Sequence, residues 1–118
     1  MLLSPADLSL VVNRIVAHYD PDQVYVFGSY AKGTMTDKSD LDLLVVRPLS
    51  IPFTRRGRNV NQLLRHFAAD FDVLFYTSEE IEAEQEDPDG FVTTIIGDAV
   101  LLYARAGSQA PLGERIGL

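Results

Sequence analysis

Apolar residues recur along the chain with two spacings, and each spacing predicts one kind of element. After Ser4, Pro5 and Asp7, which together are typical of a helix start, apolar residues recur at helical spacing up to residue 16. Short runs of β-branched and aromatic residues predict strands instead. These runs are Gln23–Phe27, Leu41–Val46, Phe71–Tyr76 and the terminal stretch AVLLYA.

Three further segments between and after these strands have helical features. Val60, Leu63, Leu64 and Phe67 share one helical face, after an irregular stretch RPLSIP. Thr77 followed three residues later by Glu80 predicts a capping box for a helix that runs until Pro88, and GFVTTIIG predicts a short helix. We expect the core order α-β-α-β-α-α-β.

The connection between the first two strands sets their direction. Gly28 to Ser39 is too short for a full crossover helix, so the strands at 23–27 and 41–46 should be antiparallel. The next connection has room for a helix and favours a parallel pair. The sequence therefore predicts an α/β (α+β) fold, a small mixed sheet with flanking helices. In this fold the end of the first strand and the starts of the second and third strands lie at one edge of the sheet.

Composition narrows the class of protein. The chain has 118 residues, enough for a single domain, which we expect at 1–106 with a loosely ordered tail at 107–118. It has no apolar run that could cross a bilayer, no signal-peptide pattern and no cysteine, which favours a cytoplasmic protein without thiolate metal ligands. A net charge of −7 argues against nucleic acid as the main partner and favours a small nucleotide or a protein.

Candidate chemistry lies at the predicted shared edge. Asp40 and Asp42 are two residues apart at a strand start, so their side chains should project from one face. Asp72, or else Asp70, should join them from the third strand. The ordinary interpretation of Asp40 and Asp42 is that one caps a turn and the other lies at a solvated strand end. Acids that interrupt a buried apolar run favour a Mg²⁺ site instead. Two ions are the arrangement suited to chemistry at phosphorus.

A glycine turn precedes these acids. Gly28 and Gly33 have the spacing of a P-loop, yet Thr34 stands where that loop needs lysine, and Lys32 comes before the glycine instead. Each glycine alone is best explained by a turn with positive φ. Beside the carboxylates, the turn is better interpreted as a phosphate-binding element that comprises Gly28, Ser29, Lys32 and Gly33.

Gly28-Ser29, ten residues, and then Asp40-x-Asp42 resembles the signature of the minimal nucleotidyltransferases, relatives of DNA polymerase β, over about residues 8 to 104. The resemblance implies a nucleotidyltransferase-like core and an activity of the EC 2.7.7 class, in which a nucleoside monophosphate, commonly AMP from ATP, moves to a hydroxyl. It also implies that Gly28 and Ser29 hold the β- and γ-phosphates, that Asp40 and Asp42 bind magnesium, and that Asp72 completes the metal site or acts as the base.

The chain departs from the family at two positions. Tyr30 and Lys32 stand where relatives often have arginines, so triphosphate contacts could come instead from Arg55, Arg56 or Arg58. The domain has no room for a large acceptor-binding module. The resemblance therefore implies a protein partner, such as the helical HEPN-domain toxin that stand-alone members neutralise as antitoxins by modifying a tyrosine.

The alternative hypothesis is a non-catalytic module that neutralises a partner by contact. The sequence leaves open the acceptor, the base of the nucleotide, whether the site is active, and the oligomeric state, homo-oligomers included.

Overall fold

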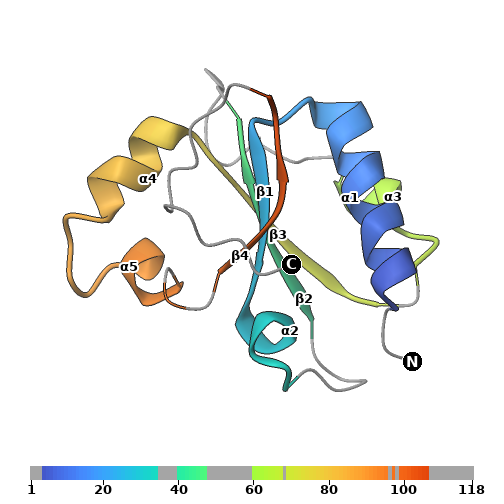
Figure 1. The fold of residues 1–118 in the computed structure, drawn as a ribbon, viewed down its shortest axis with the longest axis horizontal. Coiled ribbons are helices and arrows are strands. Elements are labelled where there is room, and N and C mark those ends of the chain that lie inside the picture. Colours follow the sequence, from blue (N-terminus) through green and yellow to red (C-terminus); the bar gives the residue numbers. More distant parts are fainter. Residues whose placement is uncertain are drawn as a thin grey trace.

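A four-stranded mixed sheet with helices on both faces forms the core of the protein (Figure 1). The computed structural model describes residues 4–34, 40–47, 60–67, 69–95, 97 and 99–106. Within them the elements are α1 (Pro5–Tyr19), β1 (Gln23–Phe27), α2 (Gly28–Lys32), β2 (Leu41–Val46), α3 (Val60–Leu63), β3 (Phe71–Tyr76), α4 (Ser78–Glu84), α5 (Phe91–Ile95) and β4 (Val100–Ala104).

The topology confirms the predicted directions of the first three strands. The strand order is β3-β2-β1-β4, with β1 antiparallel to both β2 and β4, and β2 parallel to β3. The end of β1 and the starts of β2 and β3 consequently lie at one edge of the sheet, which we call the Gly28 edge. The mixed α/β class is therefore confirmed.

The predicted element order was one helix and one strand too short. The glycine turn after β1 forms a helix of its own, α2, and all four predicted strands are present, so the order is α-β-α-β-α-β-α-α-β. Two predicted helices are also shorter than expected. α3 ends at Leu63, after which the Phe67 amide donates to the Leu64 carbonyl three residues back at 3.1 Å, as in a tight turn.

The predicted helix up to Pro88 ends earlier, at Glu84. Asp87 precedes a proline and is therefore biased away from helical backbone angles. Its side chain accepts a hydrogen bond from the Asp89 amide at 3.0 Å, which forms a local turn in place of the helix. The last predicted segment, residues 107–118, lies outside the described residues, as does most of RPLSIP, so these expectations stay predictions.

The two central strands are buried on both faces and separate two apolar layers. Leu41, Leu43 and Val45 point towards α1 and α3, and Leu44 and Val46 point towards α4 and α5. This alternation follows from the period of two in a strand and explains why β2 is continuously apolar after Asp42. Figure 1 shows the two pairs of helices on opposite sides of the sheet.

Capping hydrogen bonds fix the starts of α1 and α4. The Ser4 hydroxyl accepts from the Asp7 amide at 3.1 Å, and Asp7 accepts in return from the Ser4 amide at 3.3 Å. Thr77 and Glu80 make the same reciprocal pair at 3.1 and 2.8 Å, which confirms the predicted capping box. Among the described residues, no helix has the length and apolar character needed to cross a bilayer.

Arg105 ties the end of β4 to the start of β1, at the edge of the sheet remote from Gly28. Its guanidinium forms ion pairs with Asp20 at 2.8 Å and Asp22 at 3.3 Å, and its amide donates to the Asp22 carbonyl at 2.8 Å. The ion pair with Asp20 is exposed and adds little stability, but the backbone bond continues the pairing of the strands.

Replacing Thr77 by alanine should lower the free energy of unfolding by about 1 kcal/mol, because the Glu80 amide loses its acceptor at the start of α4. Thr94→Ala is the matched control: its exposed hydroxyl donates to the carbonyl of Gly90, the residue before α5, at 2.9 Å, and its loss should cost less than about 0.5 kcal/mol. Urea denaturation measures both values. Equal losses would contradict a specific role for the capping box.

Candidate functional site

The parallel pairing of β2 and β3 places Asp42 directly beside Asp72. Asp70 lies before the strand, and the Leu41 amide donates to its backbone carbonyl at 2.8 Å. Of the two candidates for a third acid, Asp72 is therefore the one whose side chain stands in register with Asp42. Asp40 is exposed and precedes β2 by one residue.

Asp42 and Asp72 project from the face of the sheet that α4 and α5 cover. Leu44 and Val46 pack on that face, and Asp42 has the same parity along β2. Phe27 at the end of β1 pairs with Asp42 in the antiparallel register and shares the face. Phe27, Asp42 and Asp72 thus form one row across three neighbouring strands, here called the carboxylate row.

Burial and like charge act together on Asp42. Its partial burial is the largest cause that raises the pKa of its carboxyl above the usual value, followed by the negative charges of Asp72 and Asp40. The folded protein therefore resists ionisation of Asp42. A divalent cation beside the row would offset both effects, because it neutralises the neighbouring charges and replaces lost solvation.

Asp42 and Asp72 are the two carboxylates of the row, and Asp40 is close enough to act on Asp42 through its charge. In the part of the chain that the structure describes, no three acidic or imidazole side chains are already gathered as a metal-binding cluster. Mg²⁺ is commonly held by one or two carboxylates and completed by water and substrate phosphates. The residues present therefore suit magnesium that arrives with a nucleotide better than a permanently bound ion.

Gly28 makes room for Asp42. Its φ is +70°, a conformation that L side chains rarely adopt, and a Cβ added there would overlap Oδ2 of Asp42 and lie 3.1 Å from its Cγ. The sequence predicted the turn but not this contact, because the contact depends on the register between β1 and β2. The glycine is required both by the backbone and by the packing of the carboxylate.

The short helix α2 carries the other predicted phosphate-binding residues. Ser29 lies half-buried in its first turn, Lys32 is exposed in its last turn, and Gly33 ends the helix with φ +73°. The Ser29 carbonyl accepts from the Thr34 amide at 2.9 Å, which closes the turn. The structure therefore brings Ser29 next to the Gly28 edge. Phosphate binding by these four residues stays a prediction, and Arg55, Arg56 and Arg58 lie outside the described residues.

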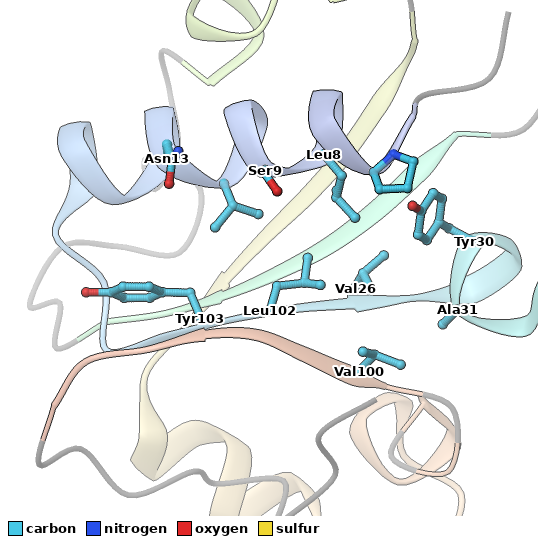
Figure 2. Close-up of a pocket in the computed structure, with 11 residues that line it drawn as sticks. Leu8, Ser9, Asn13, Val26, Tyr30, Ala31, Val100, Leu102 and Tyr103 are labelled. Atoms are coloured by element: carbon cyan, nitrogen blue, oxygen red, sulfur yellow. The ribbon is translucent and has the colours of Figure 1, made fainter. Parts of the chain in front are cut away.

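An apolar cavity of about 470 Å³ lies on the opposite face of the sheet, between α1, α2 and β4 (Figure 2). Val26, Leu102 and Val100 line its floor and α1 lines its roof, with Tyr30 from α2 at one end. Val26 has the opposite parity to Phe27, so this cavity does not open onto the carboxylate row. The candidate chemistry and the apolar cavity are separate features.

Comparison with known proteins gives a consistent identification. The family model described as polymerase beta, nucleotidyltransferase, matches residues 11–106. A nucleotidyltransferase structure from Sulfolobus solfataricus superposes with a TM-score of 0.58 at 22% identity, over 87% of this chain and 82% of the other. No curated protein matches the chain.

Two further solved structures have the same fold. A MntA-HpeT toxin–antitoxin structure superposes with a TM-score of 0.59 at 16% identity, over 88% of this chain and 75% of the other. A toxin–antitoxin structure with AMP-PNP superposes with a TM-score of 0.56 at 18% identity, over 81% and 73%. At these identities the likeness is one of fold.

Gly28→Ala should destabilise the protein more than Gly33→Ala, although both glycines have φ near +70°. At Gly33 an added methyl meets open space, so its cost is the backbone cost of about 1 kcal/mol. At Gly28 the overlap with Asp42 adds to that cost. Denaturation of both variants, with and without Asp42→Ala, measures the coupling. Equal costs, or no rescue by Asp42→Ala, would contradict the contact.

Asp42→Asn should make the protein more stable than the wild type at pH 7. Because the folded-state pKa of Asp42 is raised, its protonated form favours folding, and this contribution is full below the ordinary carboxyl range and lost as pH rises through the folded-state pKa. The stability gap between variant and wild type should therefore narrow as pH falls towards about 4. Thermal melts at both pH values test this prediction. A stability difference between variant and wild type that does not change with pH would refute it.

Proposed function

The chain belongs to the polymerase β nucleotidyltransferase family, and from this membership we propose that it moves a nucleoside monophosphate from a nucleoside triphosphate to a hydroxyl of a partner macromolecule. The observation that carries the proposal is the in-register pair Asp42 and Asp72 beside Gly28 and Ser29. Carboxylates next to a glycine turn at one sheet edge suit a metal-bound triphosphate.

In the proposed complex, Asp40 and Asp42 would hold Mg²⁺, as two ions, and Asp72 would complete the metal site or act as the base. Bound magnesium would supply charge neutralisation at the reacting phosphate. The backbone at Gly28 and the Ser29 hydroxyl bind the β- and γ-phosphates, with Lys32 and Gly33 at the other end of the same turn. This places the α-phosphorus close to the carboxylate row.

The proposed reaction is a single displacement at the α-phosphorus. The acceptor oxygen forms a bond to the α-phosphorus, the bond from that phosphorus to the bridging oxygen breaks, and pyrophosphate leaves. Asp72 is exposed, so an acceptor that approaches from solvent can reach it, and its carboxylate can take the proton of the attacking hydroxyl. Positioning and charge stabilisation supply most of the rate in such reactions.

We further propose that the nucleotide is ATP, that AMP is transferred, and that the acceptor is a tyrosine of a protein toxin, such as a helical HEPN-domain toxin. Two structural neighbours are toxin–antitoxin assemblies, and one of them contains AMP-PNP.

A second candidate function is neutralisation of a partner by contact alone. It is favoured by one observation: among the residues that the structure describes, three metal-binding side chains are not gathered in advance. On this view the family fold is a binding scaffold and the carboxylate row is idle.

Label transfer distinguishes the two functions. With Mg²⁺ and a cell extract, α-labelled ATP should label a macromolecule in the presence of wild-type protein, and Asp42→Asn should reduce the rate by about 100-fold or more. Asp70→Asn, a neighbouring acid outside the carboxylate row, is the matched control and should change the rate only a few-fold. Transfer of a γ-label would show that the reaction was assigned wrongly.

Thermal melts provide a readout that is independent of activity. Mg²⁺ with ATP should raise the melting temperature of the wild type more than that of Asp42→Asn, because ligand binding to the folded state stabilises it. If neither label moves, partner binding persists in Asp42→Asn and the melts do not respond, the contact function is correct.

A further inference from the structure

Phe91 is an exposed aromatic residue at the first position of α5. Its exposed fraction is 40%, and among the described residues only Leu10, at 54%, is another large apolar side chain of this class. A single exposed apolar side chain is ordinary on a protein surface. The position of Phe91, rather than its exposure alone, is informative.

The ring of Phe91 packs against Phe27, which belongs to the carboxylate row. The two ring centroids are 5.8 Å apart with an interplanar angle of 81°, an edge-to-face contact. Phe27 in turn pairs with Asp42 across the sheet, where side chains of opposite residues are about 5 Å apart. Phe91 therefore lies on the same face as the carboxylates, at a distance on the order of 10 Å from them.

In Figure 1, α5 lies on the α4 side of the sheet, nearer than α4 to the end where β1 runs into α2. The turn before Phe91 is fixed by hydrogen bonds. The Thr93 hydroxyl donates to the Asp87 carbonyl at 2.6 Å, and the Gly90 amide donates to the same carbonyl at 3.0 Å. Val92 and Ile95 anchor the other side of α5 in the core. The aromatic ring is thus carried by a helix that hydrogen bonds and core packing hold against the sheet.

We infer that the exposed face of Phe91 stacks against the base of the bound nucleotide. The inference rests on the proposed nucleotide site, since it places the α-phosphate at the carboxylate row. In a nucleotide one ribose joins the α-phosphate to the base, and Phe91 lies beside Phe27, the residue that pairs with Asp42 on the same face of the sheet. Aromatic stacking accepts every base but is strongest for the larger purine surface.

If Phe91 stacks on the base, replacing Phe91 should weaken the binding of ligands that carry a base and leave the binding of phosphates alone unchanged. α,β-Methylene ATP, which cannot release pyrophosphate, and inorganic tripolyphosphate each carry a chain of three phosphoryl groups, but only the first carries a nucleoside. Phe91→Leu keeps an apolar contact with Phe27 while removing the aromatic face. It should weaken α,β-methylene ATP about tenfold or more and leave tripolyphosphate unchanged, as measured by calorimetry with Mg²⁺.

A second measurement uses fluorescence and does not depend on that variant. The chain contains no tryptophan, so Phe91→Trp introduces a single reporter. α,β-Methylene ATP should quench its emission by stacking, and tripolyphosphate should not. Leu10→Trp is the matched control: it lies on α1, which covers the opposite face of the sheet, and its emission should respond to neither ligand.

The outcomes separate this inference from the proposed function. Selective loss of the nucleoside-containing ligand in Phe91→Leu, with quenching in Phe91→Trp alone, supports the stacking role. If both Phe91 variants bind α,β-methylene ATP as the wild type does, without selective quenching, stacking is refuted and the nucleotide site stands. If the wild type binds neither ligand, the nucleotide site itself is refuted, and the inference with it.

Discussion

The partial burial of Asp42 beside the like charge of Asp72 is the constraint on which the rest of the site depends. Two carboxylates in register on neighbouring strands destabilise the sheet that carries them. The surrounding strands offset this, because β1 is buried along its whole length and β2 is buried from Leu43 to Val46. Their register cannot slip without moving apolar side chains to the wrong face. The charges are held together by packing that is independent of them.

The two faces of the sheet carry different features. The face under α1 and α3 carries the larger apolar layer and the apolar cavity, whereas the face under α4 and α5 carries the acids at its open end. A single residue step along a strand, as from Val26 to Phe27, changes the face. The apolar cavity is consequently a poor guide to the chemistry of this protein, and strand parity is a better one.

Much of this arrangement could be predicted from the sequence, because it depends on local patterns. The apolar runs predicted all four strands, and the lengths of two connections predicted that β1 and β2 are antiparallel and that β2 and β3 are parallel. Features that depend on register could not be predicted. The sequence left Asp70 and Asp72 as alternatives, and it gave no indication that Gly28 packs on the Asp42 carboxylate or that Phe91 packs on Phe27. Such contacts arise only once separate strands are aligned, and α2 was missed because its one turn has no apolar period.

The direction of β4 has a practical consequence for work on this domain. β4 starts near the Gly28 edge, and it ends where Ala104 pairs with Gln23 and where Arg105 binds Asp20 and Asp22. The chain therefore leaves the sheet a full strand length away from the carboxylates. A reporter protein or an affinity handle joined after Ala106 would be attached at the far side of the domain, where it leaves the approach of a large acceptor unobstructed.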